Sequence, residues 1–237
     1  MLVALGYSCQ TRFLIDELTP GLKRQPFDFN ITSRPALINA LATDGASLEN
    51  TDDNMSRFVM PSVGREGIEV SGMFFWHDYP MDEEKLHLQP NWRDNVVNVN
   101  SKYAMLWARF SELLRSDQPK QFVMTNSQHN LPDFAADDTD FKRKFGLGKQ
   151  AFHEIVEALD AYGAQNYKLR FISRLIEDYE ETLDLKDDRL EHSFVGKLRL
   201  RVPLDLAHSL FPDIPVRSVE EGAEEARSAA DKEDIET

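Results

Sequence analysis

The succession of strand and helix patterns along the chain constrains its fold most. An apolar strand at residues 2–5 precedes a helix that we expect to run from Cys9 to Leu18. A second helix, expected to begin at Ser101, precedes a buried strand at 121–125. Such alternation is typical of α/β proteins built around a central sheet. We therefore predict an α/β fold with a central mixed, partly parallel sheet that helices flank.

Turn and cap residues divide the rest of the chain into shorter elements. Ser33 followed by Pro35 predicts a helix start, and the apolar pattern carries this helix to about Ala42. The segment at 79–99 is expected to be a long loop, and loops of this length are often functional or mobile. The remaining expected elements are three short extended segments, a helix and two strands, at residues 57–60, 68–70, 73–76, 152–162, 167–176 and 193–202.

The charge of the chain is acidic and unevenly distributed. The 237 residues carry a formal net charge of −14, and the eight acidic and two basic residues between Ser218 and Thr237 contribute −6 of it. We expect residues 1–217 to form one domain and residues 218–237 to be an acidic tail that is disordered or a frayed helix. Because neutralisation of phosphates by Lys and Arg supplies most nucleic-acid affinity, we expect no nucleic-acid partner.

Signals for membranes, secretion and metals are missing from the sequence. No stretch approaches the ~18 apolar residues of a membrane span, and no secretory signal precedes the first strand, so we expect no membrane partner. One cysteine cannot form an internal disulfide, and the cytoplasm is the simplest compartment. Because the spacings C-x-x-C and H-E-x-x-H do not occur, we expect no metal and no cofactor.

Cys9 is the only cysteine, and it lies at the turn from the first strand to the first helix. A thiol in the first helical turn faces unpaired backbone N–H groups and the positive end of the helix dipole, and both favour the thiolate. We therefore expect a reactive nucleophile, with an inert small residue as the alternative. Around the thiol, we expect Gly6, Ser8 and Gln10 to contact the substrate.

His77 is the histidine best placed to act as the base that a thiolate enzyme usually needs. It follows the apolar run at 73–76 and precedes Asp78, which places it at a strand end among aromatic residues. Asp78 is one candidate for the group that orients the base. The alternative is a histidine whose hydrogen bonds are satisfied at a strand edge.

Asn126 and His129 follow the strand at 121–125. Asn126 is a second candidate for the orienting group, and His129 is a rival base or a substrate contact. Ligands of α/β proteins bind beyond the carboxyl ends of the strands. If the first strand and the 121–125 strand are parallel neighbours, Cys9 and Asn126 will therefore line one crevice.

Asp28 and Trp92 are further candidates. Asp28 stands between two phenylalanines after a proline, which predicts that its carboxyl group is drawn inward and needs a partner. It either fixes a loop by accepting backbone N–H bonds or orients the catalytic histidine. Trp92 lies in the loop at 79–99, where it either covers a substrate or packs on the surface.

Several short segments, taken in order, resemble a bacterial family of unknown function whose members are described as candidate papain-like cysteine peptidases. They are VALGYSC at 3–9, PFDF at 26–29, HDY at 77–79 and the helix from 103 to 110 that leads to the strand at 122–123. The family pattern prefers tryptophan and phenylalanine where this chain has Phe29 and Tyr79. The resemblance covers roughly residues 2–130.

The resemblance implies a nucleophile at Cys9 and a base at His77, with Asp28, Asp78 or Asn126 as the third member. It also implies a papain-like α+β fold as the alternative architecture. Papain-like enzymes place an oxyanion-hole glutamine before the cysteine, but none of the eight residues that precede Cys9 is glutamine. The oxyanion hole is therefore unassigned.

The leading hypothesis is a cytoplasmic cysteine-dependent hydrolase or acyltransferase that acts on a small-molecule, peptide or glycan-linked substrate. The alternative is a non-catalytic module that binds a small molecule or glycan in the same crevice through Asp28, Trp92 and Asn126. A third hypothesis is an interaction protein whose acidic tail recruits a basic partner.

Overall fold

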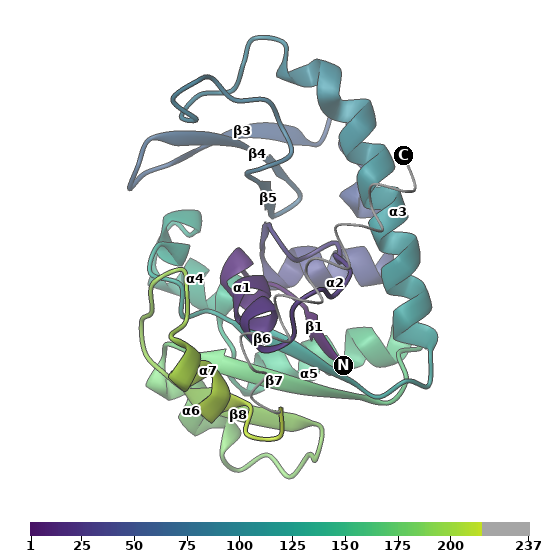
Figure 1. Ribbon diagram of the computed structural model, residues 1–237, viewed down its shortest axis with the longest axis vertical. Coiled ribbons are helices and arrows are strands. Elements are labelled where there is room, and N and C mark those ends of the chain that lie inside the picture. The colour runs from purple at the N-terminus through teal and green to yellow at the C-terminus, as the bar shows by residue number, and fades with distance from the viewer. Residues whose placement is uncertain (215–237) are drawn as a thin grey trace.

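The computed structural model describes residues 1–214 (Figure 1). It contains a parallel and an antiparallel four-stranded sheet with helices packed around them, which confirms the predicted α/β class. The two kinds of strand form separate sheets and not one mixed sheet. The strands are β1 (Leu2–Ala4), β2 (Ile31–Thr32), β3 (Met55–Met60), β4 (Arg65–Val70), β5 (Met73–Phe75), β6 (Lys120–Thr125), β7 (Tyr167–Ser173) and β8 (Leu190–Phe194). The helices are α1 (Cys9–Leu18), α2 (Arg34–Ala42), α3 (Val96–Arg115), α4 (Asp138–Phe145), α5 (Lys149–Tyr162), α6 (Ile176–Thr182) and α7 (Leu204–Leu210).

The parallel sheet has the strand order β1-β6-β7-β8, so β1 is one of its edges. Successive side chains of a strand point to opposite faces, and Leu2 and Val3 accordingly belong to different apolar clusters. Helices α1 and α7 cover the face of Leu2, whereas α3 and α5 cover the face of Val3. Burial on both faces is usual for parallel sheets.

The antiparallel sheet has the order β2-β5-β4-β3 and lies at one end of the long axis of the molecule (Figure 1). Helix α3 runs beside both sheets (Figure 1). The segment that follows β1 connects the two sheets, because Thr32 of β2 donates its backbone N–H to the Tyr7 carbonyl at 2.8 Å. The turn that carries Cys9 is thus held at the junction of the sheets.

Two helix starts expected from the sequence are confirmed. Helix α1 begins at Cys9, after Ser8, and ends at Leu18. Helix α2 begins after Ser33, whose side-chain oxygen accepts the N–H of Ala36 at 3.3 Å. Local cap and proline signals fix the start of α2, and the apolar pattern after the turn indicates that of α1.

Three expected boundaries are wrong. Ser101 does not cap α3: the helix begins at Val96, and the Ser101 hydroxyl donates within it to the Val97 carbonyl at 2.9 Å. The expected strand at 167–176 ends at Ser173, before α6. The strand expected at 193–202 is instead β8, which ends at Phe194, opposite the last residue of β7. A strand continues only where a neighbour offers backbone partners, and sequence alternation does not show this.

No helix within residues 1–214 combines the length and the apolar character needed to cross a membrane. The expected acidic tail, residues 218–237, lies outside the described residues, as do the last three residues of the expected domain, 215–217.

Candidate functional site

The carboxyl ends of β1 and β6 meet as expected, because the two strands are parallel neighbours. The Cys9 thiol lies 3.7 Å from the side-chain oxygen of Gln128, which follows β6. Beside it, the side-chain oxygen of Gln10 accepts the Ser127 hydroxyl at 2.7 Å. Gln128 was not anticipated, because only the pairing of β1 with β6 brings it to the sulfur.

The surroundings of Cys9 in the folded protein oppose the thiolate that the helix start favours. Burial raises the pKa of Cys9 to about 11, although the backbone N–H groups of Cys9 and Gln10 act in the opposite direction. Desolvation disfavours the charged form and outweighs the first-turn dipoles here. Within residues 1–214, no hydrogen bond joins Cys9 to an imidazole.

Alkylation of Cys9 should therefore be slow and should accelerate only at high pH. Since the thiolate is the reactive form, we expect the iodoacetamide rate at pH 8 to be about two orders of magnitude below that of a free cysteine. The rate should keep rising toward a midpoint near pH 11. A midpoint at or below that of a free thiol, ~8.5, would show that the helix-start N–H groups dominate.

Most neighbours of the thiol hold other parts of the fold by hydrogen bonds, and Ser8 is the exception. The Gln10 amide donates to the Arg199 carbonyl at 2.6 Å. Asn126 donates to the Phe145 carbonyl at 2.9 Å and accepts the Arg174 N–H at 2.8 Å. Gly6, at φ +94°, accepts the Thr11 hydroxyl at 2.8 Å. Ser8 is fully buried, and its hydroxyl has no hydrogen-bond partner in the described chain.

His77 belongs to a different hollow from Cys9. It is exposed, and with Asp78 it lines a depression between the end of β5 and the start of α3. Nearby protein atoms displace part of the water around the ring and so lower the pKa of His77, and the positive charge of Arg65 lowers it further. Asp78 pairs with Lys102 and accepts the Tyr103 hydroxyl at 3.1 Å, so no hydrogen bond links it to His77 within residues 1–214.

Neither Trp92 nor His129 lines the hollow that contains His77. Trp92 is 2% exposed, packs edge-on against Tyr79, and has Arg93 over its ring at 4.4 Å. It therefore packs the segment that precedes α3, and the expected loop at 79–99 ends before Val96. His129 is exposed beyond β6.

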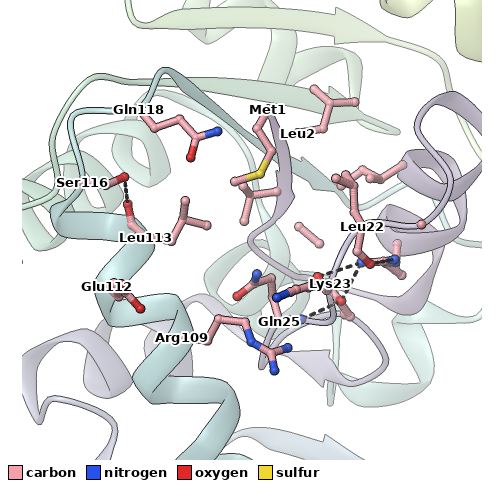
Figure 2. Close-up of a pocket in the computed structure, with 16 residues that line it drawn as sticks. Met1, Leu2, Leu22, Lys23, Gln25, Arg109, Glu112, Leu113, Ser116 and Gln118 are labelled. Carbon is pink, nitrogen blue, oxygen red and sulfur yellow. Dashed lines mark hydrogen bonds and ion pairs between the residues drawn. The ribbon is translucent and has the colours of Figure 1, made fainter. Parts of the chain in front are cut away.

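A cavity of about 400 Å³ lies along β1, on the side away from β6 (Figure 2). Its walls come from β1, α1, the loop after α1 and the carboxyl half of α3. Apolar side chains line much of it, namely Met1, Leu2, Val3, Ala4, Ile15, Leu22 and Leu113. Of the sequence-derived candidates, only Asp28 reaches this cavity.

Asp28 forms a buried ion pair in the cavity wall. Its Oδ2 accepts Nη1 of Arg12 at 2.9 Å and the backbone N–H of Gln25 at 2.8 Å. Arg12 also donates to the Leu22 carbonyl at 2.7 Å and pairs with Asp16 at 2.6 Å. As expected, the Asp28 carboxyl is drawn inward and fixes a loop; its main partner, Arg12, was not identified.

Three polar atoms around the Arg12–Asp28 pair have no hydrogen-bond partner in the described chain. Burial raises the pKa of Asp28 to about 6, and the Arg12 charge only partly opposes this. Asp28 Oδ1, Gln25 Oε1 and Arg12 Nε are buried and have no hydrogen-bond partner within residues 1–214. Buried polar atoms are normally paired, so these three are exceptions, but they lie behind the cavity wall and have no accessible surface toward the cavity.

Neither a metal centre nor a relative identifies the site. Within the described residues, no group of three or more His, Cys, Asp or Glu side chains could hold a metal ion. Comparisons with protein-family models, curated proteins and solved structures found no match for this chain. The resemblance to the family of candidate papain-like peptidases therefore stays a prediction.

Proposed function

We propose that this protein is a binding module for a small molecule, held in the cavity beside β1. The observation that carries the proposal is a largely apolar cavity that has the buried Arg12–Asp28 ion pair in its wall. Small-molecule sites are concave, mostly apolar and carry a few fixed polar groups, with volumes from about 300 to 1,000 Å³. The cavity volume of about 400 Å³ lies in this range.

The proposed site differs from the binding site expected from the sequence. The binding module was expected to use Asp28, Trp92 and Asn126 together. Asp28 is retained, whereas Trp92 and Asn126 are occupied by packing and by backbone hydrogen bonds. We include the cytoplasmic location in the proposal, on the ground that the single cysteine is free.

Replacing Leu113 with tryptophan should block the cavity. Leu113 lines the cavity from α3 and is partly exposed, so a larger ring can occupy the space without displacing the core. We expect compounds that raise the melting temperature of the wild type to bind Leu113→Trp at least tenfold more weakly. Isothermal titration of hits from a small-molecule thermal-shift screen measures this.

Met105→Trp is the matched control, because Met105 lies on the same helix, is 56% exposed and does not line the cavity. Its ligand affinities should equal those of the wild type. If every hit binds Leu113→Trp and the wild type equally, or if no compound binds the wild type, the cavity is not the functional site.

A cysteine-dependent hydrolase or acyltransferase, related to papain-like peptidases, is the second candidate. The observation that favours it is the Gln128 side chain next to the Cys9 sulfur. Its oxygen faces the thiol and its amide N–H donates to Asn130, so the amide would have to turn to supply a donor to an oxyanion. Cys9 would attack an acyl carbon, and His77 would have to approach to accept the thiol proton. His77 would return that proton to the leaving group as its bond to the acyl carbon breaks, and water or an acceptor would then cleave the thioester. Turnover of p-nitrophenyl esters that Cys9→Ser abolishes and Gln128→Leu lowers would support it; turnover that persists in Cys9→Ser would remove it.

A further inference from the structure

We propose that a second cavity, at the start of α5, binds the amide group of a peptide or of a small carboxamide. Residues of α2, α4, α5 and α6 line this cavity, together with Gly146 and Gly148 between α4 and α5. Its volume of about 310 Å³ is within the range of small-molecule sites, about 300 to 1,000 Å³. It shares no lining residue with the cavity beside β1, so the two sites are independent.

Arg34 of α2 and Asp178 of α6 bind one peptide group of the chain from two sides. Nη1 of Arg34 donates to the Gly146 carbonyl at 3.1 Å. Oδ2 of Asp178 accepts the Leu147 N–H at 2.8 Å. That carbonyl and that N–H belong to the same peptide bond, which joins residues 146 and 147. Because the C=O and N–H of a trans peptide group point in opposite directions, the two charged side chains lie on opposite sides of it.

Each of these side chains has a second polar atom that is unused. Nη2 of Arg34 donates no hydrogen bond within residues 1–214, and Oδ1 of Asp178 accepts none there. Both residues are 5% exposed and line the cavity, and both unused atoms keep accessible surface. Buried polar groups are normally hydrogen-bonded, so two unpaired atoms at one cavity are a feature expected of a ligand site.

The unused atoms repeat the pattern that binds the peptide group of residues 146 and 147. The two Nη donors of a guanidinium lie side by side, and so do the two oxygens of a carboxylate. The cavity therefore offers a donor from Arg34 and an acceptor from Asp178 to a second amide group. The carbonyl of this group would accept from Nη2, and its N–H would donate to Oδ1.

The acceptor end of the cavity holds two carboxylates. A Cβ atom added to Gly148 would lie 3.5 Å from Oδ1 of Asp178 and closer still to Oε2 of Glu181, so the two carboxylates are neighbours. Burial raises the pKa of Asp178, and the negative charge of Glu181 adds to this, against hydrogen bonds from Leu147 and Asn126. An N–H donor placed here relieves the proximity of two like charges, whereas an oxygen atom does not.

Positive and negative charges nearly balance around the cavity. Three basic and two acidic side chains line it. Two of the basic ones already have a carboxylate partner outside the lining. Arg34 pairs with Glu154, and Arg143 pairs with Asp140. A free anion or a free cation would therefore meet a like charge in the wall, whereas an uncharged amide offers both a donor and an acceptor.

NMR titration of the ¹⁵N-labelled full chain with four benzene derivatives of similar size tests both ends of the amide. Benzamide carries the carbonyl and the N–H, methyl benzoate and benzoate lack the N–H, and benzamidine lacks the carbonyl. We expect benzamide to shift the Leu147 amide signal, because this N–H is bonded to Asp178. The other three compounds should bind at least about tenfold more weakly, since each loses a hydrogen bond to a charged group.

A trialanine peptide with an acetylated N-terminus and an amidated C-terminus distinguishes the two sources of the amide group. Tighter binding of this peptide than of benzamide would identify a peptide as the ligand. Binding of benzamide without binding of the peptide would identify a small carboxamide.

Thr139→Trp tests the location of the site. Thr139 lines the cavity from the first turn of α4 and is exposed, so a larger ring can fill the space without displacing the core. We expect at least about tenfold weaker binding of the amides. Lys149→Trp is the control, because Lys149 is likewise exposed in the first turn of α5 but does not line the cavity. It should leave the affinities unchanged.

The inference is overturned if neither benzamide nor the peptide shifts any signal at about 10 mM, or if one of the other three compounds binds as tightly as benzamide. It is also overturned if Thr139→Trp and the wild type bind the amides equally. None of these results bears on the cavity beside β1, whose test is Leu113→Trp.

Discussion

Replacement of Arg12 with methionine is expected to lower the free energy of unfolding by about 3–5 kcal/mol, because it leaves a buried carboxylate without its partner. The Asp28 side chain is 2% exposed and that of Arg12 is 8% exposed, so water cannot replace the guanidinium without local opening. The substitution also removes the hydrogen bond to the Leu22 carbonyl. Urea unfolding at pH 8, followed by far-UV circular dichroism, measures the loss.

The loss of stability in Arg12→Met should depend on pH, in a direction that the pKa of Asp28 sets. The folded-state pKa of Asp28, about 6, is above the unfolded value of 3.8, so folding takes up a proton here. The stabilisation that protonation of Asp28 gives the folded state is fully present below the unfolded pKa and is lost as the pH rises through about 6. Without Arg12 the folded pKa rises further, and Arg12→Met should therefore be less destabilised at pH 5 than at pH 8.

Two controls separate the buried charge from other effects of the Arg12 substitution. The double variant Arg12→Met/Asp28→Leu removes both charges and should recover part of the stability. Arg201→Met removes an exposed arginine whose ion pair with Glu17 spans 3.4 Å, and it should cost less than about 1 kcal/mol. Equal losses for Arg12→Met and Arg201→Met would contradict the buried pair as a source of stability.

Gly45→Ala is expected to cost about 3–4 kcal/mol, because two separate penalties apply. Gly45 has φ +82°, a conformation that L residues adopt at a cost of about 1–2 kcal/mol. A Cβ atom there would also lie 2.5 Å from Cδ2 of Trp107. The indole would have to move, which breaks its hydrogen bond to Asp44, at 3.0 Å, and its packing on Phe110.

Gly163→Ala is the matched control for the backbone penalty. Gly163 has φ +90°, and a Cβ atom added there would have no neighbouring atom within 4 Å, so only the cost of about 1–2 kcal/mol applies. Thermal unfolding of both variants should show the larger loss for Gly45→Ala. If the two losses are the same, the Trp107 ring moves aside without a loss of stability, and its close contact with residue 45 is unimportant.

Local signals explain the parts of the fold that could be predicted. Ser33 and Pro35 set the start of α2 because a cap hydrogen bond and a fixed φ act over a few residues. The end of β8 at Phe194 could not be predicted, because it depends on where β7 stops offering partners. The division into two sheets likewise depends on pairings between distant strands.

In the candidate site, too, local features could be predicted from the sequence and contacts between distant segments could not. The inward position of Asp28 between two phenylalanines was predicted from its neighbours, and it is buried. Its pairing with Arg12, 16 residues earlier, depends on how the loop after α1 folds back. The pKa of Cys9 was expected in the wrong direction, because the sequence indicates the helix start but not the burial that outweighs it.

The sequence by itself determined the α/β class, the start of α1 at Cys9 and the start of α2, since periodicity and cap chemistry are local. Only the tertiary structure decided that Gln128 and not a histidine lies beside the thiol, and that Arg12, Gln25 and Asp28 surround a cavity. The physical reason is that desolvation and charge pairing depend on which distant segments pack together. Spacing along the chain carries no record of that packing.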